Sequence, residues 1–305
     1  MGYVMVEAER RTQAEGSPPF GFLLKTWRQR RKLSQLDLAL EAGVSQRHLS
    51  FLESGRSRPS RSMALHLAAA LDLPLRERNH LLLQAGFAAA YDERSLSSAD
   101  MTAVRQALEL TLRHHEPFPA IVIDRAWNLV LANQATFRFL ALFGPQEAIW
   151  ARVDPSGRRN VMRLSFHPAG LQAFLRNWRE AAGQALNRLQ RETAADPGHL
   201  ALRELFEDLL RMPGVPVDWR ARVWDTVPPP IVPLELDLQG RTLRLFSMLS
   251  TFGTALDVTA EELRVETFFP ADDASDRFLR DLAGASAIIP GATDPAAAGP
   301  CIPGS

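Results

Sequence analysis

Four polar side chains at the start of one short segment have the chemistry to form hydrogen bonds with the edges of DNA bases. Ser45, Gln46, Arg47 and Ser50 all carry hydrogen-bond donors, and Leu49 between them can turn inward if the segment is a helix. Arginine and glutamine can each make two hydrogen bonds to a single base in the major groove. The spacing therefore predicts a helix whose exposed first turn enters that groove.

A second helix and a tight corner are predicted just before this segment. Ser34 can cap the first helix and Ser45 the second, because a serine hydroxyl accepts hydrogen bonds from the free N–H groups of a helix start. Gly43 suits the left-handed conformation of the corner, and Val44 can fill the corner from inside. The apolar positions expected for the first helix are Leu36, Leu38, Ala39 and Ala42. Two helices joined in this way can also form a simple packing corner, so the flanking residues decide between the interpretations.

Basic side chains flank the predicted corner on both sides. Between Phe20 and Ala90 the sequence has 11 Lys or Arg and 5 Asp or Glu, a formal charge of about +6, although the whole chain is +0. The rest of the chain is therefore acidic, as expected if one module approaches phosphates and the other does not. The basic residues nearest the corner are Lys25, Arg28, Arg30, Arg31 and Lys32 before it, and Arg56, Arg58 and Arg61 after it.

Apolar residues recur at helical spacing before and after the corner. They predict a helix that starts at Phe20 and two further helices at about 61–71 and 75–85. Five short helices, with the corner between the second and the third, resemble the phage-repressor or Xre family of DNA-binding domains over residues 20–87. The resemblance implies an all-α, five-helix, lambda-repressor-like domain.

The resemblance also implies individual roles. Gln35 should bind a phosphate from the start of the second helix, while Gln46 and Arg47 should read bases. His48 lies on the same helix and is expected to contact the sugar-phosphate backbone rather than a metal ion. The candidate DNA-binding residues are therefore Gln35, Ser45, Gln46, Arg47, His48, Ser50, Arg56 and Arg58.

Composition argues against most other classes of protein. The 305 residues are 46% hydrophobic, enough for two cores, and the single cysteine, Cys301, rules out an internal disulfide. No stretch reaches the ~18 apolar residues of a membrane span, and residues 1–16 lack the apolar core of a signal peptide, so we expect a cytoplasmic protein. Phosphate-binding loops are absent, and His114 and His115 are adjacent rather than four residues apart. We expect no catalytic residue, no cofactor and no metal site.

A second domain of different character is predicted after about residue 117. Residues 120–124 and 127–132 read as two short strands, and Asn133 can cap a helix behind them, an opening typical of a PAS-type sensor module. Residues 168–212 are expected to be helical, with one apolar stripe from Leu171 to Leu189 and another from Leu202 to Leu210. Three more strands are predicted at about 231–238, 241–250 and 263–269, with a capping box between Thr259 and Glu262. The pattern predicts an α+β domain with about five antiparallel strands and covering helices.

Several short motifs extend the resemblance to the whole chain. They are His115–Ala120 (HEPFPA), Trp127-Asn128, Thr251–Thr259 (TFGTALDVT), Glu261–Leu263 (EEL) and Phe268–Asp272 (FFPAD). Together with the N-terminal domain they resemble the MmyB-like transcription regulators over residues 20 to about 280, although Ala255 replaces a proline of that family. The resemblance implies a PAS-like ligand-binding domain whose effector is a fatty-acid-like or other apolar small molecule.

Large apolar side chains of the second domain are the candidates for a ligand pocket, although such residues more often fill a core. These candidates are Phe137, Phe143, Trp150, Phe174, Trp178, Phe246, Met248 and Phe252. Arg176 and Arg179 could meet a carboxylate head group, or could simply belong to a solvated helix face.

The sequence therefore predicts a ligand-responsive DNA-binding regulator that binds a double-stranded operator, as a homodimer. The domains are expected at 17–90 for the DNA-binding domain, 91–116 for a linker and connecting helix, and 117–280 for the PAS-like domain, with disordered termini at 1–16 and 281–305. Two alternatives stay open: the second domain only dimerises or docks a protein partner, or it is an unrecognised enzyme.

Overall fold

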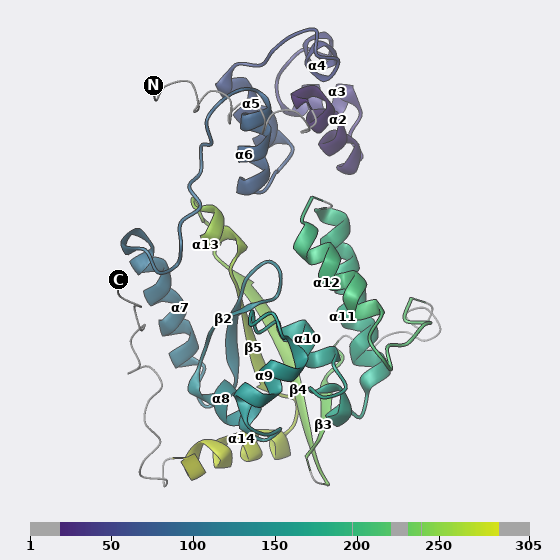
Figure 1. The fold of residues 1–305 in the computed structure, drawn as a ribbon. Coiled ribbons are helices and arrows are strands. Elements are labelled where there is room, and N and C mark those ends of the chain that lie inside the picture. The colour runs from purple at the N-terminus through teal and green to yellow at the C-terminus, as the bar shows by residue number, and fades with distance from the viewer. Residues whose placement is uncertain (1–18, 197, 221–230, 239, 287–305) are drawn as a thin grey trace, which may run out of the picture. The chain divides into compact units, whose positions relative to one another are not determined.

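A computed structural model describes residues 19–196, 198–220, 231–238 and 240–286 of the chain (Figure 1). The chain divides into two units, and each is described here by itself. The N-terminal domain comprises residues up to Thr102 together with residues 252–262, and the C-terminal domain comprises the remainder. The segments 1–16 and 287–305, for which disorder was predicted, lie outside the described residues.

Within its described residues, the N-terminal domain contains the predicted bundle of five short helices. A core of leucines from every helix, including Leu24, Leu38, Leu49, Leu67 and Leu82, is almost completely buried. The helices are α2 (Phe20–Arg30), α3 (Gln35–Glu41), α4 (Gln46–Glu53), α5 (Arg61–Ala70) and α6 (Leu75–Gln84).

The predicted corner between α3 and α4 has the expected local chemistry. The Ser34 hydroxyl accepts from the Asp37 N–H, and the Asp37 carboxylate accepts from the Ser34 N–H in return, which completes a capping box. The Ser45 hydroxyl caps α4 through the His48 N–H, and Gly43 has the left-handed φ of +58° that favours glycine. One predicted core position is wrong, because Leu36 is 49% exposed.

The C-terminal domain contains the five-stranded antiparallel sheet that the sequence predicted. Neighbouring strands follow the order β2-β1-β5-β4-β3, so that the two ends of the domain's sequence meet where β1 pairs with β5. In this register Glu266 on β5 lies between Ile121 on β1 and Leu249 on β4. The strands are β1 (Ala120–Ile123), β2 (Leu129–Ala132), β3 (Leu234–Leu238), β4 (Arg241–Thr251) and β5 (Arg264–Pro270).

Helices cover this sheet on both faces. In Figure 1, α7 lies on one side of the sheet, and α10, α11 and α12 lie on the other. Asn133 caps α8 through the Thr136 N–H, as predicted. The helices are α7 (Thr102–His114), α8 (Gln134–Ala141), α9 (Gln146–Val153), α10 (Val161–Phe166), α11 (Trp178–Ala195), α12 (Leu200–Leu210) and α14 (Asp273–Ser286), with a short 3₁₀ turn η2 (Gln172–Phe174). A further 3₁₀ turn, η1 (Ala99–Met101), precedes α7 and belongs to the N-terminal domain. No helix of the described residues is long and apolar enough to cross a bilayer.

Three predictions for this domain are corrected by the structure. Residues 168–212 are not helical throughout, because Leu175 forms a bridge with Leu236 at the sheet edge before α11 begins. The tail predicted to be disordered from residue 281 is helical to Ser286, since α14 packs Phe278 and Leu279 into the core. Thr259, predicted to start a helix with a capping box, instead lies inside a short helix, and its N–H donates to the Asp257 carboxylate.

The segment predicted to hold that capping box instead folds with the N-terminal domain. It contains α13 (Val258–Glu262), and the carboxylate of Asp257, not the Thr259 hydroxyl, accepts from the free N–H groups of its first turn. Aspartate is a strong capping residue, so two positions earlier in the sequence it takes the place of the threonine.

Candidate DNA interface and ligand cavity

The first turn of α4 presents the polar residues expected to read bases. Gln46 and Arg47 are exposed, whereas His48 and Ser50 are half-buried. The Arg47 guanidinium lies over the Phe51 ring at 5.4 Å from its centroid. A cation above an aromatic face loses little when it turns toward another partner at an exposed site, because such contacts contribute only about 0.5–1 kcal/mol there.

A buried ion pair fixes α4 against α2. Arg28 donates from Nε to Glu53 Oε1 at 2.6 Å and from Nη2 to Glu53 Oε2 at 2.9 Å, and it also donates to the Leu33 carbonyl. Burial would raise the pKa of the Glu53 carboxyl, but hydrogen bonds from Arg28 and Gln35 and the nearby positive charge outweigh it and lower that pKa. The pair therefore orients the predicted recognition helix from inside the domain.

The close approach of α2 to α4 also depends on one glycine. A Cβ at Gly21 would lie 2.5 Å from the Leu52 carbonyl oxygen and 2.6 Å from that of Glu53. No larger residue fits between these two backbones without moving one helix.

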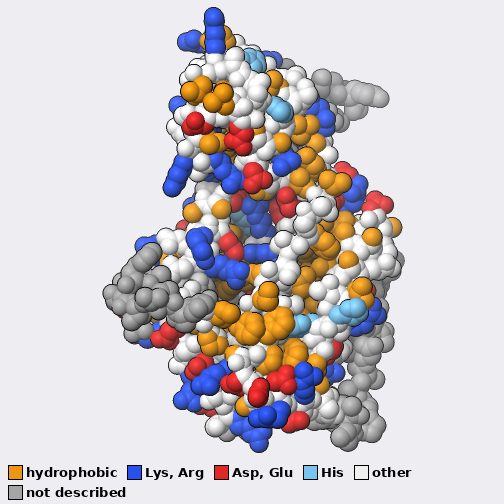
Figure 2. All heavy atoms as spheres, turned by 180° about the vertical axis from the view of Figure 1, so that it is seen from behind, with side chains coloured by type: hydrophobic (Ala, Val, Ile, Leu, Met, Phe, Trp, Pro, Cys, Tyr) orange, Lys and Arg blue, Asp and Glu red, His pale blue; other side chains and the backbone are white. Residues whose placement is uncertain are grey.

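The predicted phosphate-binding residues divide into two groups. Gln35 is half-buried, and its Nε2 donates to Glu53 Oε2 at 2.8 Å, so it belongs to the ion-pair cluster as well as to the start of α3. Arg56 and Arg58 are exposed in the loop that follows α4, as is Arg61 at the start of α5. Figure 2 shows Lys and Arg side chains projecting from this domain.

The C-terminal domain contains a partly open cavity of about 560 Å³. Its walls come from all five strands on the sheet side and from α8 to α11 on the other, and most of them are apolar. Figure 2 shows hydrophobic side chains gathered on one face of this domain. Apolar wall residues include Ile121, Trp127, Phe139, Leu140, Met162, Phe166 and Phe268.

A cluster of polar and charged groups interrupts the apolar wall. Glu266 is a buried carboxyl on β5, and Ser247 on β4 donates to its Oε1 at 2.7 Å. Burial raises the pKa of Glu266 and lowers that of Arg188, which lines the same cavity from α11. Arg191 lines it one turn further along the helix.

Trp127 joins this cluster to the end of β5. Its ring lies between two guanidinium groups, with Arg264 at 4.5 Å and Arg188 at 5.2 Å from the ring centroid. The indole Nε1 donates to Glu192 at 2.9 Å, and Arg264 donates to the other oxygen of the same carboxylate at 2.8 Å. The aromatic wall and the charged cluster are therefore one connected unit.

Only some of the candidate pocket residues line the cavity. Trp150, Trp178 and Phe246 do so, whereas Phe143 and Phe174 pack edge to face with each other in the core, 4.8 Å between centroids. Met248 is 57% exposed, Phe252 belongs to the N-terminal domain, and Phe137 lies outside the cavity wall.

The arginines proposed for a head group are also outside the cavity. Arg176 donates to the Thr242 hydroxyl, and Arg179 forms an exposed ion pair with Asp218. Arg188 and Glu266 were not among the candidates predicted from the sequence. The signal for Glu266 was its position as a single acidic residue in the middle of a largely apolar strand.

Comparisons with known proteins agree with the two domains. The family model for the MmyB-like transcription regulator ligand binding domain matches residues 104–282, and a helix-turn-helix family model matches residues 24–78. Both matches confirm the resemblance that the sequence motifs indicated. Among solved structures, the PAS domain from Bordetella pertussis BvgS is similar at 18% identity, covering 60% of this chain and 99% of that chain, with a TM-score of 0.23. No curated protein matches the chain.

Proposed function

The chain belongs to the MmyB-like transcription regulators through its ligand-binding domain, and we propose that this domain binds an apolar molecule that carries an anionic group. With its helix-turn-helix domain, the protein is a DNA-binding transcription regulator that has a ligand-binding domain. The observation that carries the proposal is the cavity of about 560 Å³, a volume suited to a small ligand, with apolar walls and one charged cluster.

The balance of charge in that cluster favours an anion. Arg188, Arg191 and Arg264 provide three positive charges, and Glu192 provides one negative charge, which contacts Arg264, Trp127 and, at 3.4 Å, Arg188. Burial raises the pKa of Glu266, which favours its neutral form. A carboxylate in the cavity would compensate the excess positive charge.

Calorimetric titration of the full-length protein tests this ligand class. Dodecanoate, dodecanol and dodecylammonium share one chain and differ only in head group, and we expect dodecanoate to bind most tightly. Arg188→Gln should weaken dodecanoate binding by roughly tenfold or more, the typical effect of losing a charge-assisted hydrogen bond. Arg176→Gln is the matched control, since Arg176 contacts Thr242 and does not line the cavity.

Two outcomes would count against the proposal. Equal binding of the three head groups, or no effect of Arg188→Gln, would leave a purely apolar pocket. If none of them binds, and mass spectrometry finds no small molecule in extracts of the purified protein, the C-terminal domain serves dimerisation or protein docking instead.

On DNA, Gln46, Arg47 and Ser50 are proposed to contact bases, and Arg56 and Arg58 to contact the sugar-phosphate backbone. A homodimer would place two copies of α4 in successive major grooves about 34 Å apart. Selection of duplexes from a random pool by the full-length protein should return two half-sites with that spacing. A single unrepeated site would refute the dimer, and no enrichment at all would refute sequence-specific binding.

A further inference from the structure

The connection between β4 and β5 folds as part of the N-terminal domain. Residues 252–262 leave β4 at Thr251 and return to β5 at Arg264, yet they group with the helical bundle and not with the sheet. Within this segment α13 packs against α6, and Val258 and Ala260 are buried. Residues 252–262 therefore connect two strands of the C-terminal sheet and yet fold as part of the N-terminal domain.

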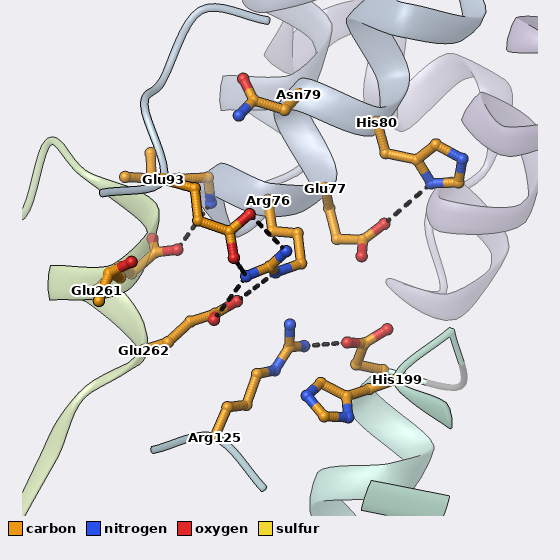
Figure 3. A network of polar contacts seen from close by, with 12 residues as sticks. Arg76, Glu77, Asn79, His80, Glu93, Arg125, His199, Glu261 and Glu262 are labelled. Atoms are coloured by element: carbon orange, nitrogen blue, oxygen red, sulfur yellow. Dashed lines mark hydrogen bonds and ion pairs between the residues drawn. The ribbon is translucent and has the colours of Figure 1, made fainter. Parts of the chain in front are cut away.

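The strongest contact of the segment is an ion pair with α6. Arg76 donates from Nε to Glu262 Oε1 at 2.7 Å and from Nη2 to Glu262 Oε2 at 3.0 Å (Figure 3). The same guanidinium also contacts Glu93, which belongs to the N-terminal domain by sequence. Glu262 and then Glu93 hold the pKa of Arg76 above its ordinary value. Two carboxylates therefore share one arginine, and only Glu262 comes from the β4–β5 connection.

Glu261 supplies a cap that α6 lacks in its own sequence. The residue before α6 is Pro74, which has no side-chain hydrogen bond to the helix start, and the Leu75 N–H donates instead to Glu261 Oε2 at 2.8 Å. A carboxylate at a helix N-terminus satisfies a free N–H group and is favoured by the helix dipole. Figure 3 shows Glu261 and Glu262 side by side at this end of α6.

A third set of contacts secures the start of α13. The Val258 N–H donates to the Asp92 carbonyl at 2.9 Å, and Arg94 lies 3.5 Å from the buried carboxylate of Asp257. Backbone, cap and ion pair together bind the segment at separate points, which restricts its rotation as well as its position.

The strands at either end of the segment form part of the cavity wall. Phe246 and Ser247 on β4 and Glu266 and Phe268 on β5 all line the cavity. Arg264, the first residue of β5, stacks on Trp127 in the same wall. A change in the cavity that moves β4 or β5 would therefore also move residues 252–262, which join these two strands and contact Arg76 and Leu75.

We propose that the β4–β5 connection, residues 252–262, transmits the state of the cavity to the DNA-binding domain through its contacts with α6. This inference rests on the proposed function, since it names the element through which a ligand would regulate DNA binding. The route within the N-terminal domain is packed throughout, because α6 contacts α2 and α2 contacts α4. Coupling requires that the two states of the cavity favour different arrangements of this one element.

Hydrogen exchange of the full-length protein provides the first test. Glu262→Gln removes the charge that comes from the connection, and Glu93→Gln removes the other carboxylate charge at the same arginine, so the two variants are a matched pair. In Glu262→Gln we expect exchange at the start of α6 and in α13 to rise by roughly tenfold, and in Glu93→Gln by less than about threefold. Equal exchange in the two variants would overturn the proposed contact.

The second test perturbs the cavity without any ligand. Ser247→Phe fills the charged cluster and Phe268→Leu enlarges the apolar part, so at least one perturbation is available if the other variant does not fold. Each should change exchange in α6 by more than about threefold in the wild-type and Glu93→Gln backgrounds, and by less in Glu262→Gln. No change in the wild-type background, or an equal change in Glu262→Gln, would overturn the coupling.

Dodecanoate serves as a third perturbation in the same three backgrounds. Its failure to bind would count against the ligand class proposed above and not against the coupling, which the two cavity variants decide. If it binds and alters exchange in α6 equally in Glu262→Gln and in wild type, the β4–β5 connection is not the transmitting element.

Discussion

Replacement of Glu53 by glutamine tests whether the buried pair with Arg28 fixes α4. The substitution keeps the shape of the side chain but removes the negative charge of the carboxylate, which accepts two hydrogen bonds from Arg28 and one from Gln35. Arg28 is 8% exposed and has the Leu33 carbonyl as its other acceptor. Loss of one partner from a buried pair costs about 3–5 kcal/mol, so even the lower figure predicts about a hundredfold faster hydrogen exchange in α2 and α4.

The comparison variants separate loss of the pair from loss of any acidic charge. Glu41 is exposed at the end of α3, and Glu41→Gln should leave exchange nearly unchanged. A double variant, Arg28→Met with Glu53→Met, should recover most of the protection, because apolar groups of similar volume often replace a buried pair at little cost. Exchange in Glu53→Gln within about threefold of Glu41→Gln would refute the role of the pair.

The same pair has a definite pH dependence. Because the pKa of Glu53 is lowered in the folded protein, its contribution to stability is present above the ordinary pKa of a glutamic acid and is lost as the pH falls through the lowered value. Protection of α4 in the wild type should therefore decline on acidification over that range, and Glu53→Gln should lack this component.

Three further predictions concern other positions. Arg47→Ala should reduce the free energy of binding to the selected duplex by about 1–3 kcal/mol and relax the preference at one base pair of each half-site. Arg58→Ala should instead weaken binding to all duplexes alike and reduce the slope of log K against log salt by about one unit; both are measured by fluorescence anisotropy. Gly21→Ala should destabilise the N-terminal domain by about 1–3 kcal/mol in the exchange assay, while Gly284→Ala, where a Cβ meets nothing within 4 Å, should not. Burial raises the pKa of Glu266, so its carboxyl group holds a proton more tightly in the folded protein than in the unfolded chain. The stability of the C-terminal domain, measured by calorimetry, should therefore fall as the pH rises above about 4.5, and Glu266→Gln should remove that fall.

The N-terminal domain could be predicted almost completely because its signals are local. The caps at Ser34 and Ser45 and the left-handed Gly43 each depend on residues within one turn of the chain. The error at Leu36 has an equally local reason. At about 100° per residue, Leu38, Ala39 and Ala42 fall within one arc of α3, whereas Leu36 lies about 60° beyond it, on the outward side.

The cavity could not be assigned in the same way, because its wall is assembled from segments far apart in the sequence. Of the aromatic candidates Trp150 is buried and the others are half-buried, and size alone does not distinguish a side chain that lines a cavity from one that packs against the core, as Phe143 and Phe174 do. The charged residues of the wall depend on the strand register, which the sequence does not show. In that register Glu266 lies between the apolar residues Ile121 and Leu249.

Tertiary contacts also decide which basic residues of the N-terminal domain are available to DNA, a distinction that net charge hides. Arg28, Arg31, Arg76 and Arg78 donate hydrogen bonds within the domain, to Glu53, the Leu71 carbonyl, Glu262 and the Leu73 carbonyl respectively. The other seven form no ion pair or side-chain hydrogen bond with a described residue: Lys25, Arg30, Lys32, Arg47, Arg56, Arg58 and Arg61.

This division sets an upper limit on the salt dependence of DNA binding. If all seven neutralised phosphates, the slope of log K against log salt would be about −6 for each N-terminal domain, at about −0.9 for each contact. Lys25, Arg30 and Lys32 belong to α2 and its end, whereas Arg47, Arg56, Arg58 and Arg61 lie on α4, in the loop after it and at the start of α5. If α4 enters the groove, these four should dominate, giving a slope nearer −3 or −4 for each domain, roughly a third of what the eleven basic residues would suggest. A slope steeper than about −6 per domain would mean that a paired arginine leaves its partner to bind DNA, contrary to the structural roles assigned to Arg28 and Arg76.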